Sequence, residues 1–108
     1  MSSGYEFTER SELDTAVDAW IANEASATTT YGNINTWDVS AITDFSSLFI
    51  NQTTFNSDIS AWDVSNGVSF DYMFYDAQSF NQYIGGWDVG SATRFDYMFS
   101  NADSFNQD

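Results

Sequence analysis

Trp62-Asp63-Val64 is the most informative stretch of this sequence, because the same tripeptide stands 25 residues before it and 25 residues after it. The other copies are Trp37-Asp38-Val39 and Trp87-Asp88-Val89. A fixed step of this size is typical of repeat proteins, in which one repeat cannot bury its own apolar face and stacks on its neighbours. We therefore predict one continuous domain with an N-terminal helical cap and three 25-residue repeats, the last of them truncated. The predicted bounds are 1–36 for the cap and 37–61, 62–86 and 87–108 for the repeats.

The residues that follow each tripeptide predict the local structure of a repeat. The alternation of Trp62 and Val64 indicates a short strand with one buried face. The spacing of Phe70, Met73 and Phe74 indicates one helical turn with its apolar face inward. Stacked repeats would pair their strands in parallel at about 4.8 Å. The sequence thus predicts an α/β solenoid with short parallel strands.

Three further columns are predicted to be structural. Aromatic residues in register would form continuous spines through the core. Asparagines in register would bond backbone groups at the bends, which lack strand partners. The members are Trp37, Trp62 and Trp87, then Phe55, Phe80 and Phe105, then Asn56, Asn81 and Asn106.

Apolar residues near the N-terminus recur with helical spacing and predict an amphipathic helix over residues 8–23. They are Leu13, Ala16, Val17, Trp20 and Ile21. Thr8 is the predicted N-cap, and residues 25–30 are expected to add a loose turn or a short helix. The helix should cover the exposed side of the first repeat, as terminal caps of repeat proteins do.

The composition excludes several classes of function. The net charge is −14, from 16 acidic residues against Arg10 and Arg94. This charge argues against binding to nucleic acid and to anionic membranes, because Lys and Arg are needed to neutralise their phosphates. No apolar run reaches the roughly 18 residues of a membrane span, and residues 1–4 do not resemble a signal peptide. The chain also lacks histidine and cysteine, and nothing in it activates a nucleophile, so we predict that it is not an enzyme.

The repeat pattern W-D-V-S-x-(V/I)-T-x-F-x-x-M-F-x-x-A-x-S-F-N-Q-x-I resembles that of BspA-like bacterial surface proteins, relatives of the leucine-rich repeats. The resemblance covers residues 31–108. It implies a right-handed leucine-rich-repeat-like coil, an extracellular or cell-surface location, and adhesion or recognition of proteins or glycans. The chain departs from the pattern where Gly67 and Ala92 replace the apolar residue that is Ile42 in the first copy.

Asp38, Asp63 and Asp88 are candidate metal ligands, because they point away from the core and would form a ladder of like charges. A calcium ion bridging two of them is one interpretation. The other, which we favour, is that each carboxylate accepts a hydrogen bond from a turn N–H two residues on. No other cofactor is predicted.

Tyrosines and acids on the outer side of the predicted helical turn form a candidate ligand-binding surface. Rigidly presented tyrosines make good contact area for proteins or glycans, although stacking between repeats would also explain them. The residues are Tyr72, Tyr75, Tyr83 and Tyr97 with Asp71 and Asp96.

The sequence leaves two functions open. The first is an adhesion or recognition module, and the alternative is a structural subunit of an extracellular fibre. The last repeat would expose an apolar edge, which predicts self-association through the C-terminal end of the stack. We expect that contact to be isologous, because the outer face of the N-terminal helix is acidic.

Overall fold

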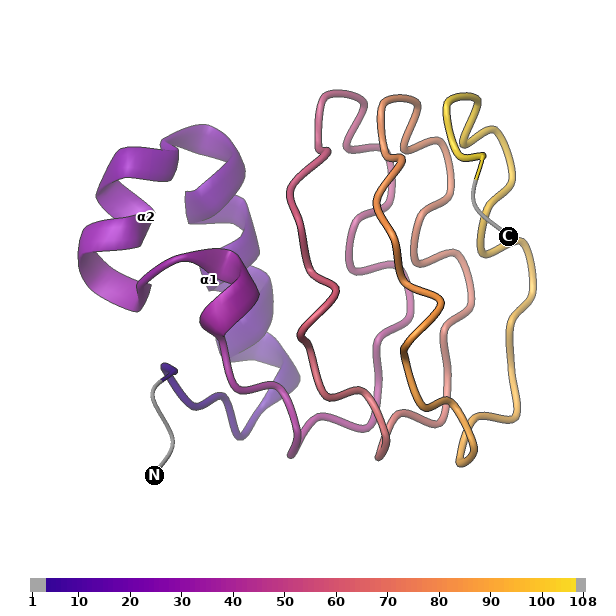
Figure 1. Cartoon of the computed structure of the whole chain (residues 1–108), viewed down its shortest axis with the longest axis horizontal. Coiled ribbons are helices and arrows are strands. Elements are labelled where there is room, and N and C mark those ends of the chain that lie inside the picture. Colours follow the sequence, from indigo (N-terminus) through magenta and orange to yellow (C-terminus); the bar gives the residue numbers. More distant parts are fainter. Residues whose placement is uncertain (1–3, 107–108) are drawn as a thin grey trace.

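A computed structural model describes residues 4–106, in which two helices are followed by three similar turns of chain lying side by side (Figure 1). Helix α1 spans Arg10–Ala22, helix α2 spans Glu24–Tyr31, and a 3-10 helix spans Ile34–Thr36. We call residues 37–61, 62–86 and 87–106 repeats 1, 2 and 3. The remainder of the predicted cap, 1–3, and of the predicted third repeat, 107–108, lies outside the described residues.

The predicted α/β solenoid is wrong, because the described residues form no β-sheet. Strand-like pairing within 4–106 is confined to isolated parallel bridges, Glu6 with Asp38, Asp44 with Ser69, and Ser69 with Arg94. The Trp-Asp-Val segments do not pair with one another as strands. The leucine-rich-repeat class implied by the resemblance is therefore not supported either.

Tight turns on both sides of each tripeptide explain why no strand forms there. The N–H of Trp62 donates to the carbonyl of Ile59 at 3.1 Å, and the N–H of Gly67 donates to the carbonyl of Val64 at 2.9 Å. The backbone around the tripeptide thus forms its hydrogen bonds with residues three positions away in the chain, and not with the equivalent tripeptide of the next repeat. Alternation of Trp and Val buries both side chains but does not create a ladder between repeats.

The helical turn predicted at Phe70–Phe74 is also absent, and a series of tight turns replaces it. N–H groups there alternate between two partners. The N–H of Tyr72 donates to the carbonyl of Asp96 in repeat 3 at 2.9 Å, whereas the N–H of Met73 donates to Phe70 within the repeat at 3.2 Å. Such turns bring single residues to positive φ, which neither a helix nor a strand contains. The residues are Ser47, Asn51, Tyr72, Asp76, Tyr97 and Asn101.

The predicted N-terminal helix is confirmed as α1, although it begins at Arg10 with Glu9 rather than Thr8 as the N-cap. The carboxylate of Glu12 accepts from the N–H of Glu9 at 3.3 Å, which satisfies a free donor at the helix start. The short helix predicted after it is present as α2. Trp20 of α1 meets the ring of Trp37 edge-on at 6.0 Å, so α1 packs against repeat 1.

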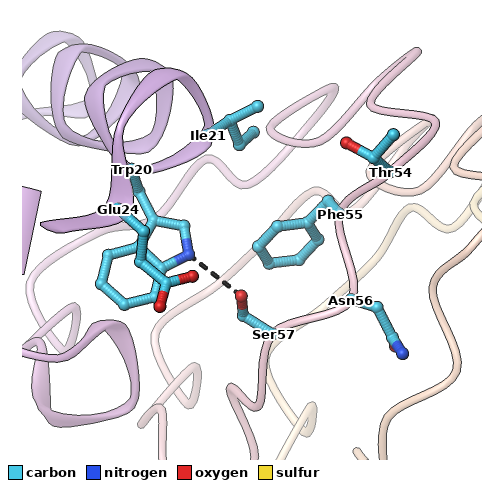
Figure 2. A pocket seen from close by; sticks show the side chains of 7 residues that line it. All are labelled: Trp20, Ile21, Glu24, Thr54, Phe55, Asn56 and Ser57. Carbon is cyan, nitrogen blue, oxygen red and sulfur yellow. Dashed lines mark hydrogen bonds between the residues drawn. The ribbon is translucent and has the colours of Figure 1, made fainter.

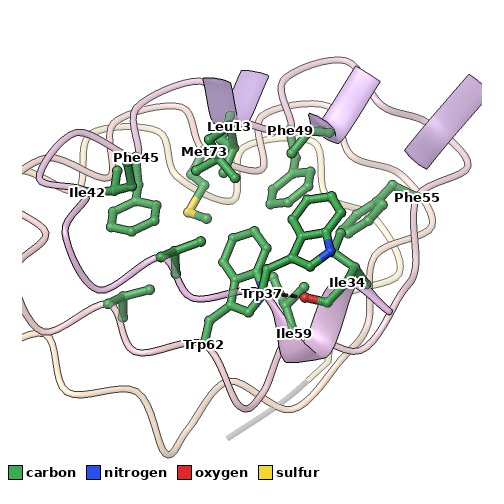
Figure 3. Close-up of a cluster of buried hydrophobic side chains, with 14 of the residues drawn as sticks. Leu13, Ile34, Trp37, Ile42, Phe45, Phe49, Phe55, Ile59, Trp62 and Met73 are labelled. Carbon is green, nitrogen blue, oxygen red and sulfur yellow. Dashed lines mark hydrogen bonds between the residues drawn. The ribbon is translucent and has the colours of Figure 1, made fainter. Parts of the chain in front are cut away.

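Stacked rings form the core of the three repeats, and Figure 3 shows the part of it around Trp37 and Trp62. Phe45 and Phe70 lie 5.3 Å apart with their planes only 5° from parallel, and Phe70 stacks on Phe95 at 5.5 Å. Trp37 and Trp62 stack at 6.3 Å. Because each ring meets its equivalent in the next repeat, burial is greatest in repeats 1 and 2. In repeat 3, by contrast, Phe95 is 45% exposed and Val89 is 36% exposed.

Candidate functional site

The turn segments of repeats 2 and 3 present three tyrosines on the surface. Tyr72 and Tyr97 occupy equivalent positions, and their rings stack at 5.3 Å with 24° between the planes. The ring of Tyr75 leans on that of Tyr72 at 5.4 Å. Tyr72 is 37% exposed and Tyr97 is 63% exposed. We call Tyr72, Tyr75 and Tyr97 the tyrosine patch.

The backbone at Tyr72 and Tyr97 adopts a conformation that is energetically unfavourable for bulky residues. Tyr72 has a φ of 59° and Tyr97 a φ of 56°. A left-handed conformation favours glycine, asparagine and aspartate, whereas for a bulky residue it is an outlier that costs about 1–2 kcal/mol. The other positive-φ column follows this preference, with Asn51, Asp76 and Asn101. Two tyrosines therefore stand where the backbone favours a small polar residue.

An ion pair lies beside the patch and links repeats 2 and 3. Asp71 is buried, and one of its carboxylate oxygens accepts from Arg94 Nε at 2.6 Å. The other oxygen accepts from the N–H of Asp96 at 2.7 Å. Arg94 also lies 3.5 Å from the carboxylate of Asp96, whose side chain is largely exposed. Asp71 and Arg94 thus hold the two tyrosine-bearing turns in register.

These contacts shift the protonation of the pair. The hydrogen bond from the Arg94 guanidinium lowers the pKa of Asp71, partial desolvation works against it, and the N–H of Asp96 lowers it further. The bond to Asp71 raises the pKa of Arg94 in turn. Both groups stay charged at neutral pH, so Asp71 and Arg94 form an ion pair between the two turns.

Tyr83 is the one predicted ligand-binding tyrosine that the structure does not bring to the patch. Its ring is 60% exposed and makes no ring contact with the other tyrosines within the described residues. It lies against Gly85, where an added Cβ would come within 2.8 Å of the ring.

The three aspartates of the tripeptides accept hydrogen bonds from residues two positions on. Asp38 accepts from the N–H of Ser40 at 3.0 Å and Asp63 from that of Ser65 at 3.0 Å. Asp88 accepts from the N–H of Gly90 at 2.9 Å. The hydroxyl of Ser65 is the main cause that lowers the pKa of Asp63. These are the turn bonds that we favoured, and no group of three or more potential ligands gathers among the described residues.

The asparagine column bonds from one repeat to the next at the bend after each phenylalanine. The side-chain oxygen of Asn56 accepts from the N–H of Asn81 at 2.8 Å, and that of Asn81 accepts from the N–H of Asn106 at 2.9 Å. Gln82 adds a bond to the carbonyl of Asn56 at 2.9 Å. In these bonds a side-chain oxygen accepts from the backbone N–H of the next repeat, as a backbone carbonyl does in a sheet.

A small cavity of about 190 Å³ lies between the helices and the first bend of the stack (Figure 2). Trp20, Ile21 and Glu24 line it on one side, and residues 54–57 line it on the other. The indole N–H of Trp20 donates to the hydroxyl of Ser57 at 3.0 Å across it. Sequence analysis missed this cavity because its two walls come from segments about thirty residues apart with no shared pattern.

The chain matches the family described as "Mycoplasma protein of unknown function, DUF285" over residues 19–108. This chain belongs to that family. No curated protein and no solved structure matches it. No described helix is long and apolar enough to cross a membrane.

Proposed function

We propose that this chain is a non-enzymatic recognition module, displayed outside the cell, and that the tyrosine patch contacts its protein or glycan ligand. The observation that carries the proposal is the exposed stack of Tyr72 on Tyr97 over left-handed backbone. Strain of this kind persists where the surrounding structure holds it, and it clusters at functional sites.

The energetics favour a role in binding over a role in folding. A ring pair is worth about 0.5–1.5 kcal/mol beyond its burial, and an exposed pair lies at the low end of that range. Two tyrosines in left-handed backbone cost about as much or more. Their stacking therefore gives little net stability, whereas rigid aromatic surface is what recognition sites use as anchors.

The resemblance of the repeats to those of BspA-like surface proteins supports the proposed setting and the class of function. It adds no residue roles. The proposal that the surface binds ligand therefore rests on the patch itself and not on the resemblance.

The alternative is a structural subunit that associates through the end of the stack, and the exposure of Val89 and Phe95 supports it. The backbone hydrogen bonds, however, disfavour the isologous contact between two C-terminal ends that we expected. Four equivalent N–H groups of repeat 2 donate to repeat 3, from Phe70, Tyr72, Phe74 and Asp76. Their counterparts at Phe95, Tyr97, Phe99 and Asn101 have no partner among the described residues. Two such ends would oppose donor to donor, which disfavours the isologous contact.

Binding of the wild-type chain to arrays of glycans and of extracellular proteins tests the proposal. The Tyr72→Ser/Tyr97→Ser double variant should lose the hits, and Tyr83→Ser, which removes an exposed tyrosine outside the patch, should keep them. If the double variant still bound the same ligands, the binding site would lie outside the tyrosine patch, and the patch would have no assigned role.

A further inference from the structure

The column that contains Tyr72 and Tyr97 is incomplete in repeat 1. The equivalent residue there is Ser47, which shares the left-handed backbone with a φ of 59°. The N–H of Ser47 donates to the carbonyl of Asp71 at 2.8 Å, so Ser47 lies directly beside the turn that carries Tyr72. Tyr97 stacks on one face of Tyr72. The 25-residue step that places Tyr97 on one face of Tyr72 places Ser47 on the opposite side of the turn, and the short side chain of Ser47 supplies no ring there. The ring of Tyr75 contacts Tyr72 at a tilt of 57° from within the same repeat.

The charges around this open position are negative. Asp44 accepts a hydrogen bond from the N–H of Ser46, next to Ser47, and its own side chain is more than half exposed. Asp76 and Asp96 belong to the turns of the patch. The only two basic residues of the chain are already paired, Arg10 with Asp14 and Asp44, and Arg94 with Asp71 and Asp96. Neither arginine is therefore free to occupy this surface.

We infer that the open face of Tyr72 above Ser47 takes the guanidinium of an arginine in a partner protein. A guanidinium is planar, so it fits where a further ring of the column would stack, and it is attracted to the aromatic face. Its charge complements the acids of the surface and the net charge of −14. This inference rests on the proposed recognition function and names the ligand class of the same patch.

A glycan is the weaker candidate for this position. A neutral sugar ring would stack on the tyrosine but would gain nothing from the surrounding carboxylates beyond hydrogen bonds. An acidic sugar would be repelled by them. A lysine would be attracted as strongly from a distance, but its compact ammonium cannot lie flat on the ring.

The test uses calorimetry at about 150 mM salt with three flexible peptides of one length, carrying arginine, lysine or glutamine at the same positions. Any cationic peptide is drawn to a protein of charge −14, so charge-conserving variants of the protein decide the outcome. Ser47→Tyr fills the stacking position without altering charge, and the backbone there already matches that of Tyr72 and Tyr97. Ser47→Asn is the matched control, because asparagine suits this backbone and leaves the position open.

We expect the arginine peptide to bind most tightly and to lose about tenfold in affinity with Ser47→Tyr and with Tyr72→Ser. Ser47→Asn and Tyr83→Ser should bind as the wild type does. Equal affinity of wild type and Ser47→Tyr, or equal affinity for the arginine and lysine peptides, would overturn the inference. Tyrosine-dependent binding of a neutral oligosaccharide without binding of the arginine peptide would overturn it as well, but would leave the recognition function in place. Absence of any tyrosine-dependent ligand would contradict both.

Discussion

The indole N–H of Trp62 donates to the backbone carbonyl of Ile34 at 2.7 Å, a bond between residues 28 positions apart. Trp87 repeats the contact with the carbonyl of Ile59 at 3.2 Å. Each tryptophan thus fills the core of its own repeat and ties it to the end of the segment before. These side-chain hydrogen bonds link consecutive segments of the stack, as backbone hydrogen bonds link paired strands in a sheet.

Replacing Trp62 with alanine should be the most damaging change in the stack. Trp62 is buried and stacks on Trp37 of repeat 1, so its removal leaves a large cavity and takes one of two N–H donors from the carbonyl of Ile34, which keeps its bond from the N–H of Trp37. We expect a loss of about 3–5 kcal/mol in the free energy of unfolding, measured by urea denaturation. Trp62→Phe keeps most of the ring but removes the donor, and it should cost clearly less. An unchanged melting temperature for Trp62→Ala would show that the tryptophan column does not support the core.

Removing the acceptor of Asn56 should weaken the bend between repeats 1 and 2. Its side-chain oxygen accepts from the N–H of Asn81 and from the side chain of Gln82. Because the site is exposed to water, we expect Asn56→Ala to cost only about 0.5–1.5 kcal/mol in urea denaturation. Asn56→Asp retains an acceptor oxygen and should cost less than alanine. Equal losses for the two variants would mean that the oxygen is not what matters.

Acid should weaken the contact between repeats 2 and 3 through Asp71. Its pKa in the folded state lies below the ordinary value of 3.8, chiefly because of the hydrogen bond from Arg94. The pair therefore stabilises the folded state above about pH 4, and this contribution is lost as the pH falls through the folded-state pKa. Asp71→Asn should be less stable than the wild type near pH 7, and the gap should narrow toward about pH 2. Because acid also relieves the repulsion of the −14 charge, the wild type and the variant must be compared at each pH. A gap that does not change with pH would rule out the pair as its cause.

The sequence predicted the repeat but not the way in which repeats pair. The 25-residue step and the columns of Phe70 and Trp62 follow from side-chain identity, which a pattern displays directly. The N-terminal helix was predicted for the same reason, since its apolar stripe is periodic. The position of the N-cap differs by one residue because Glu12 reaches back to Glu9 as well as to Thr8.

The strands and the helical turn were predicted wrongly because the spacing of apolar residues does not determine which backbone groups form hydrogen bonds with one another. Phe70, Met73 and Phe74 are spaced as on a helix, yet positive φ at Tyr72 and Asp76 converts the segment into consecutive turns. Asp76 is a residue type that tolerates positive φ, whereas a tyrosine, as at position 72, does not predict it. For the same reason, the positive φ at Tyr72 and Tyr97, and with it the geometry of the candidate site, could not be predicted from the sequence. Tyrosine and aspartate could be named as ligand-binding residues, but the stack of Tyr72 on Tyr97 required the structure.

We propose that the tyrosine patch serves an external ligand and not folding, and the free energy of unfolding of the Tyr72→Asn/Tyr97→Asn variant separates these two roles. Asparagine relieves the left-handed strain at both positions, and this gain offsets the loss of an exposed ring stack. Urea denaturation should therefore give a free energy within about 1 kcal/mol of the wild type, or above it. A loss of about 2 kcal/mol or more would show that the tyrosines hold the repeats together, and would contradict the account.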